Sequence, residues 1–150
     1  MPGPFAATLA CAVLIASPAL AAPFTTVDGT AKYISMLDEG TLVRSNGGVE
    51  AEALLVTSSS ARLVKFRFDC AARTWRLVSK RSVGADMTLS APTMVDEPAA
   101  AAQPGSLGAS LLERACFGRL VNASGGGSTP TLGEAIVDAR AILVRANSQP

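Results

Sequence analysis

The fold is decided by ten residues, ARLVKFRFDC, at positions 61–70. Apolar and charged side chains alternate along most of this stretch. The apolar set is Val64, Phe66, Phe68 and Cys70, and the charged set is Lys65, Arg67 and Asp69. Alternation with a period of two indicates a strand that has one face buried and the other in water. The stretch therefore predicts a half-buried β-strand with Cys70 on its core-facing side.

Further strands are expected on both sides of this one, within the region that begins near Phe24. Short runs rich in apolar residues alternate there with turn residues. They cover residues 32–37, 41–45, 49–58 and 74–81. The strongest hairpin signal is Asn46-Gly47-Gly48, because Asn and Gly tolerate positive φ. A turn is also expected at residues 38–40, and consecutive strands joined by short turns pair as an antiparallel meander.

The pattern changes after Gly84. Residues 86–103 contain two prolines and an alanine run, and they predict a long connection rather than a strand. A helix is expected over residues 107–116, with Ser106 as its N-cap and Gly118 as its stop. Its apolar stripe comprises Leu107, Leu111 and Leu112, extended by Ala115 and Cys116.

The C-terminal part predicts a linker and a second helix. Residues 119–130 contain three consecutive glycines, which is typical of a flexible linker. Within residues 131–150, Thr131 and Glu134 match a capping box, so a helix is expected over residues 132–146. Its apolar face comprises Leu132, Ile136, Ala139 and Leu143. This face would serve docking on the domain, self-association or contact with a membrane surface.

The N-terminus predicts export. Residues 1–21 carry no charged side chain and contain an apolar run at residues 9–15, followed by a proline and by small residues flanking Leu20. This pattern is typical of a secretory signal peptide cleaved after Ala21, so that the mature chain begins at Ala22. The predicted location is therefore the periplasm or the cell surface, and residues 22–118 are long enough for one small domain.

Two alternatives to a cleaved signal peptide are a retained membrane anchor and lipidation at Cys11. The anchor is disfavoured because the apolar run is shorter than the roughly 20 residues that span a bilayer. Lipidation is disfavoured because Cys11 precedes most of the apolar run.

Cleavage would leave two cysteines, Cys70 and Cys116. Two cysteines in an exported chain favour one disulfide. Two free buried thiols are an alternative. A metal site is a weaker one, because the chain has no histidine and two thiols are too few ligands.

Composition narrows the function classes. The formal net charge of +1 argues against a nucleic-acid surface. The absence of histidine excludes Ser-His-Asp and Cys-His catalysis. Glu50 and Glu52 share a strand face, and Asp96 adjoins Glu97, but such carboxylates are usually solvated surface groups. No enzyme activity, metal or cofactor is therefore expected, and a small hydrolase built on these carboxylates is the weakest hypothesis.

The best ligand-facing hypothesis rests on basic residues of two neighbouring strands. Lys65 and Arg67 share the polar face of one strand, and Arg76 and Lys80 are expected to share one face of the next, near Arg81. Such a patch would suit an acidic polysaccharide, an anionic lipid or an acidic protein. The alternative is a solvated sheet face partly neutralised by Glu50, Glu52 and Asp69.

An ordered set of motifs in residues 24–118 resembles the surface-adhesin protein E family. The motifs are the strand end Asp69-Cys70, the aromatic-basic pair Trp75-Arg76, the signal Pro104-Gly105-Ser106, a helix ending at Cys116, and the short strand Thr41-Leu42-Val43-Arg44. The resemblance implies a twisted antiparallel sheet of about six strands and a helix joined to it by a disulfide, in which Cys70 matches the strand cysteine and Cys116 the helix cysteine. Adhesin members of the family bind host extracellular proteins.

The predicted fold is therefore α+β: a twisted antiparallel sheet of five to six strands, a helix tethered to one face by a disulfide, and a C-terminal helix. The predicted function is that of an exported, non-enzymatic and adhesin-like binding protein of the cell envelope, with a protein or an acidic polysaccharide as ligand. The alternative is a structural envelope protein that docks on a partner or a membrane through its C-terminal helix.

Overall fold

The computed structural model of the chain describes residues 23–121 and 127–148. The predicted signal peptide, with its cleavage site and Cys11, lies outside these residues, as does the centre of the predicted glycine linker.

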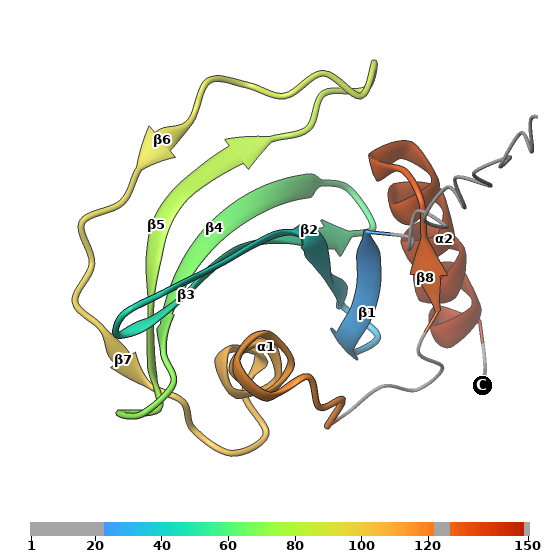
Figure 1. Cartoon of the computed structure of the whole chain (residues 1–150). Coiled ribbons are helices and arrows are strands. Elements are labelled where there is room, and N and C mark those ends of the chain that lie inside the picture. The colour runs from blue at the N-terminus through green and yellow to red at the C-terminus, as the bar shows by residue number, and fades with distance from the viewer. Residues whose placement is uncertain (1–22, 122–126, 149–150) are drawn as a thin grey trace, which may run out of the picture.

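One antiparallel sheet forms the body of the molecule and curves around the helix α1 (Figure 1). The spatial order of its strands is β6-β5-β4-β3-β2-β1-β8, and β7 pairs with β5. The long strands are β1 (Phe24–Gly29), β2 (Tyr33–Ser45), β3 (Gly48–Thr57), β4 (Ala61–Asp69) and β5 (Thr74–Ser82). The short strands are β6 (Thr93–Met94), β7 (Ala100–Ala101) and β8 (Ser128–Thr129). The α+β class and the antiparallel sheet are confirmed.

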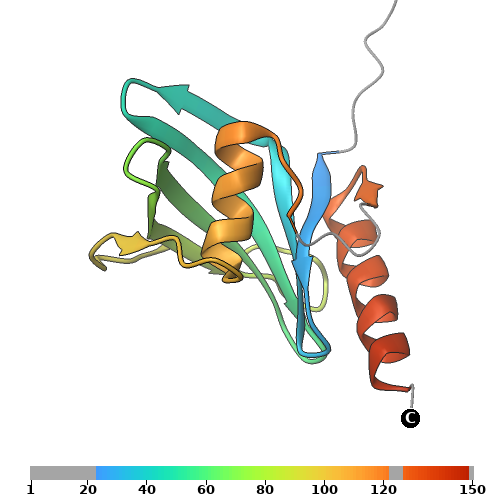
Figure 2. The same cartoon turned by 90° about the horizontal axis from the view of Figure 1, so that it is seen from below.

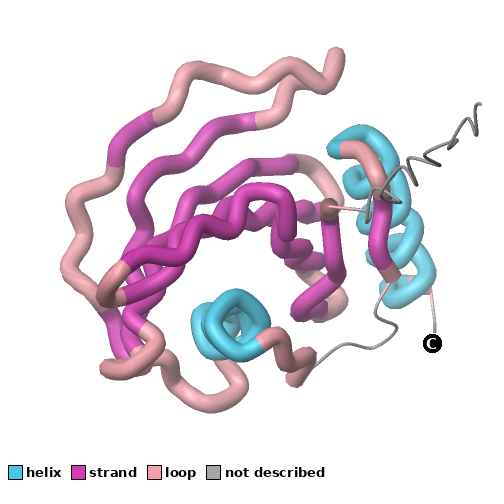
Figure 3. Tube along the Cα trace, in the orientation of Figure 1, coloured by secondary structure: helices cyan, strands magenta, loops and turns pink. Residues whose placement is uncertain are grey.

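The described residues form more strands than the five to six expected, because three short strands lie in segments predicted to be irregular. The strands β6 and β7 occur within the long connection, which otherwise follows the outer edge of β5 as loop (Figure 3). The strand β8 occurs in the predicted linker and pairs with β1. A strand of two residues is too short to show an alternation of apolar and polar residues in the sequence. Its position depends on the neighbouring strand with which it pairs.

The prediction of a turn at residues 38–40 is wrong. β2 continues through this segment, and its pairing with β3 shifts register between Asp38 and Val43. A carboxylate oxygen of Asp38 accepts from the backbone N–H of Gly40 at 3.0 Å, and the Thr41 hydroxyl donates to the Asp38 carbonyl at 2.8 Å. These local hydrogen bonds satisfy groups that an irregular ladder leaves unpaired, so turn-forming residues produce a bulge here.

The helix α1 (Leu107–Phe117) lies on the concave face of the sheet. Its predicted ends are confirmed, since the Ser106 hydroxyl accepts from the backbone N–H of Ala109 and Gly118 adopts the left-handed conformation. The fully buried Leu111 and Leu112 pack into the core of this face. The sheet contributes Val27, Leu37, Val49, Ala51, Ala53, Val64, Phe66 and Phe68. A disulfide joins Cys70 and Cys116, as predicted.

The helix α2 (Leu132–Asn147) lies across the sheet from α1 (Figure 2). The N-cap at Thr131 is confirmed, since its hydroxyl accepts from the backbone N–H of Glu134 and donates to the Glu134 carboxylate at 2.8 Å. The buried residues of α2 are Ala135, Ile136, Ala139 and Leu143, and they pack on Ile34, Met36, Leu54, Val56 and Leu63 of the sheet. Of the three uses considered for this apolar face, docking on the domain is the one that the structure shows.

We expect α2 to contribute measurably to the stability of the domain. Shortening the buried Ile136 in Ile136→Val should lower the free energy of unfolding by about 0.5–1.5 kcal/mol, because it leaves a methyl-sized gap. The neighbouring Val137 is 60% exposed, so Val137→Ala should change the free energy of unfolding by less than about 0.5 kcal/mol. Urea titration of both variants checks this, and equal effects would contradict a stabilising contact at Ile136.

Candidate functional site

The face of the sheet opposite α1 has two parts. One part is apolar and is covered by α2. On the other part, strand register brings charged residues together: Glu50 lies opposite Arg67, and Glu52 lies opposite both Asp38 and Lys65. We call this part the charged face. Its members are Asp38, Glu50, Glu52, Lys65, Arg67, Asp69, Arg76 and Arg81.

The predicted grouping of Arg76 with Lys80 is wrong. In the pairing of β4 with β5, Leu77 lies opposite Phe66 but Ser79 lies opposite Lys65, so Val78 is an extra residue. Such a bulge reverses the faces of all later residues in its strand. Arg76 therefore lies opposite Arg67 on the charged face.

The same bulge decides the positions of Lys80 and Arg81. Lys80 lies opposite Val64, on the face that carries α1. Arg81 lies opposite Leu63 and joins the charged face. A bulge of one residue cannot be recognised from the residue types in a strand. The sequence therefore predicted that side chains alternate between the two faces along the whole of β5.

Three of the four cations on the charged face are bound by glutamates. Lys65 contacts Glu50 at 2.9 Å, and Arg67 contacts the same carboxylate at 3.8 Å. Both oxygens of Glu52 accept from Arg81 at 3.1 Å. The interpretation of a partly neutralised face therefore holds for these residues. Partly exposed pairs of this kind contribute about 0–1 kcal/mol each.

The electrostatics of the glutamates do not favour acid-base chemistry. The hydrogen bond from Lys65 lowers the pKa of Glu50, and the charges of Arg67 and Arg76 lower it further. Glu50 is therefore ionised at neutral pH and cannot act there as a general acid. Both oxygens of Glu52 are engaged by Arg81. The two glutamates are thus bound to cations and do not form a matched acid and base.

Arg76 is the fourth cation of the charged face, and its surroundings differ from those of the other three. It is exposed, and no carboxylate of the described residues lies within 4.0 Å of its guanidinium. Its direct cross-strand neighbour is Arg67, which is also exposed. Like charges directly opposite each other destabilise a pair of strands. This arginine pair is therefore the least compensated feature of the charged face.

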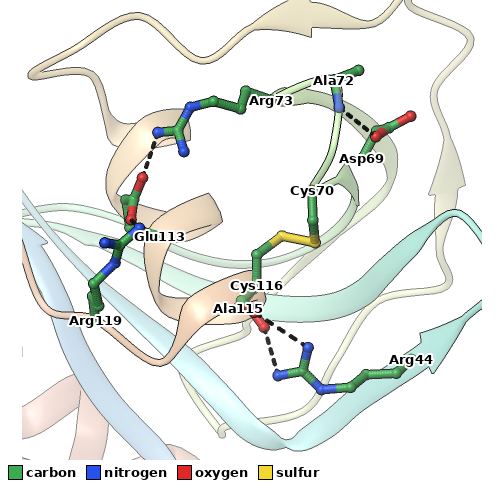
Figure 4. Close-up of a disulfide and its surroundings, with 9 residues drawn as sticks. All are labelled: Arg44, Asp69, Cys70, Ala72, Arg73, Glu113, Ala115, Cys116 and Arg119. Atoms are coloured by element: carbon green, nitrogen blue, oxygen red, sulfur yellow. Dashed lines mark hydrogen bonds and ion pairs between the residues drawn. A yellow bond between two sulfur atoms is a disulfide. The ribbon is translucent and has the colours of Figure 1, made fainter.

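A hollow of about 280 Å³ lies beside the arginine pair. It is lined by Gly47, Arg67, Phe68, Asp69, Thr74, Trp75, Arg76 and Ala99. One carboxylate oxygen of Asp69 accepts from the backbone N–H of Ala72 at 2.8 Å, which holds this side chain to the turn (Figure 4). The sequence did not indicate the hollow, because the ends of the β2–β3 and β4–β5 hairpins and the chain beside β7 meet there only through strand register.

Comparison of the chain with protein-family models, curated proteins and solved structures found no match. No helix within residues 23–121 and 127–148 is long and apolar enough to cross a membrane. The same residues contain no group of three side chains suited to hold a metal ion.

Proposed function

We propose that this protein is an exported, non-enzymatic binding protein of the cell envelope, and that its ligand is an acidic polymer that contacts Arg67 and Arg76. The observation that carries the proposal is the direct opposition of these two exposed arginines, with no carboxylate of the described residues within 4.0 Å of Arg76. A bound sulfate or carboxylate would relieve their repulsion. Guanidinium groups suit such ligands because they donate two parallel hydrogen bonds to one anion.

The size of the hollow favours one unit of a polymer over a free small molecule. Pockets that bury whole drug-sized ligands usually have volumes of about 300–1,000 Å³. The hollow beside Arg67 and Arg76 has about 280 Å³ and lies open on the sheet surface. An acidic sugar of a polysaccharide or an acidic side chain of a protein would fit in this hollow. The rest of the ligand polymer would then lie along the charged face.

Two features support export. The predicted signal peptide provides the route, and a disulfide between Cys70 and Cys116 is typical of an oxidising compartment. The resemblance of residues 24–118 to surface-adhesin protein E agrees with a binding role. The alternative role of docking through the C-terminal helix gains no support, because the apolar face of α2 is buried against the sheet.

Binding to immobilised dextran sulfate and to polyglutamate tests the proposal. Arg67→Ala combined with Arg76→Ala should weaken retention at least about tenfold, since a hydrogen bond to a charged group contributes about 1.5–3 kcal/mol. Lys80→Ala is the matched control, because Lys80 lies on the opposite face. It should change retention less than about twofold, the effect of a distant exposed charge.

Two results would contradict the proposed site. One is undiminished retention of the double arginine variant on both polymers. The other is an equal loss in Lys80→Ala, which would show attraction by overall charge rather than by the arginine pair. Urea titration of each variant confirms that the fold is intact.

A further inference from the structure

A second exposed feature lies at the C-terminal end of α1, away from the charged face. Two guanidinium groups lie near the ring of Phe117, with Arg119 at 5.0 Å and Arg73 at 5.9 Å from its centre. The carboxylate of Glu113 binds both arginines, and its contact with Arg119 measures 2.8 Å (Figure 4). The three charged groups therefore hold the ring in a defined position at the surface.

Phe117 belongs to a small apolar patch. It is 45% exposed, and the following chain exposes Leu120 by 42% and Val121 by 55%. Three large apolar side chains thus face water within five residues. Scattered exposed apolar residues are normal, but several within one short segment beside charged side chains are typical of an interaction surface.

The position of the patch is rigidly defined by the fold. Cys116, which precedes Phe117, is bonded to Cys70 at the end of β4. The Arg44 guanidinium donates to the carbonyl oxygens of Ala115 at 3.0 Å and Cys116 at 3.4 Å. A preformed surface loses little conformational entropy when it binds.

The rim of the patch carries an excess of positive charge. Four arginines surround the helix end: Arg44, Arg73, Arg114 and Arg119. Among the residues that the structure describes, two carboxylates, Glu39 and Glu113, are paired with them. Arg114 contacts Glu39 at 2.7 Å and also donates to the Gly118 carbonyl. The remaining charge at this end of the helix is therefore positive by two.

We infer that the C-terminal end of α1 docks on an anionic phospholipid bilayer. Phe117, Leu120 and Val121 enter the boundary between headgroups and acyl chains, and the arginines meet lipid phosphates. Apolar side chains ringed by basic ones are the arrangement that binds such interfaces, through buried apolar area and through attraction of about 1 kcal/mol per basic residue. The exposed apolar residues come directly at and after the end of α1, and we take a lipid boundary as the partner because it accepts apolar side chains and attracts arginines at the same place.

Flotation with lipid vesicles tests this inference. Vesicles rich in phosphatidylglycerol should bind the protein, and vesicles of phosphatidylcholine alone should bind it at least about tenfold less, because the arginine attraction is then absent. Phe117→Ala and Leu120→Asp should each reduce binding to the anionic vesicles about tenfold or more, the effect of losing one inserted side chain. All variants carry the same N-terminus, so any contribution of that segment cancels.

Matched controls come from the exposed face of α2 and from the charged face. Val137 and Val144 are 60% and 66% exposed, so Val137→Asp and Val144→Asp remove comparable apolar surface elsewhere. Both should leave vesicle binding unchanged, as should Arg67→Ala combined with Arg76→Ala. These controls separate this inference from the proposed polymer site.

Several results would overturn the inference. They are no binding to anionic vesicles, equal binding to both vesicle types, and unchanged binding of Phe117→Ala and Leu120→Asp. A loss in the α2 variants would show non-specific adsorption, and a loss in the double arginine variant would place lipid contact on the charged face. If Phe117→Ala weakened only polyglutamate binding, the partner of this patch would be an acidic protein instead.

Discussion

Replacing Phe68 with alanine should lower the free energy of unfolding by about 3–5 kcal/mol, the cost of deleting a buried aromatic side chain. Phe68 is fully buried in the core beneath α1, and its ring stacks on Phe66 at 5.8 Å. Phe66 in turn contacts Trp75 edge to face at 5.7 Å. The substitution therefore opens a cavity at the centre of an aromatic group that joins β4 and β5.

Urea titration measures this effect, and Phe117→Ala is its matched control. Phe117 undergoes the same chemical change at an exposed position, where the main loss is two cation–π contacts of about 0.5–1 kcal/mol each. Phe68→Ala should therefore be the more destabilising variant by a clear margin. Similar midpoints for the two variants would contradict the assignment of Phe68 to the core.

Removing the disulfide with Cys70→Ala and Cys116→Ala should cost about 4 kcal/mol of stability, according to the chain-entropy relation for its loop length. The bridge closes a loop with a sequence separation of 46 residues, which contains β5 and most of α1. Without it, the unfolded chain gains freedom, and α1 is held on the sheet by its apolar contacts and by polar contacts such as that between Arg114 and Glu39.

The single variant Cys70→Ala is the control, because it also lacks the bridge and should match the double variant within about 1 kcal/mol, the uncertainty set by the remaining buried thiol. Intact mass before and after reduction shows the bond directly, since two thiols should react with an alkylating agent only after reduction. The same measurement tests the predicted mature start at Ala22. Stability of the double variant equal to that of the oxidised protein would contradict a stabilising bridge.

Local chemistry explains why much of the fold could be predicted from the sequence. The alternation along β4 follows from one buried face, and the caps at Ser106 and Thr131 satisfy helix N–H groups in the way that these side chains do in general. The disulfide followed from cysteine number and the expected compartment. Each of these features depends on a few neighbouring residues or on the chain as a whole.

The features that could not be predicted depend on pairing between distant residues. The register shift between Asp38 and Val43 adds three residues to β2, and the bulge at Val78 adds one residue to β5. The bulge at Val78 decides which face carries Lys80 and Arg81. The contact between Phe117 and Arg73 depends on the turn between β4 and β5, which is distant from Phe117 in the sequence. One available signal was missed: the run Ala53-Leu54-Leu55-Val56 is apolar on both faces, as expected for a sheet covered by a helix on each side.

The central claim, that Arg67 and Arg76 form an anion-binding site, is tested most directly by a nuclear magnetic resonance titration with a short sulfated oligosaccharide. We predict saturable shifts of the Nε–H signals of Arg67 and Arg76 and of backbone amides in residues 66–68 and 75–77. The signals of Lys80 and of Phe117 should remain in place. Shifts centred on Lys80 or on the end of α1, or shifts that do not saturate, would contradict the claim.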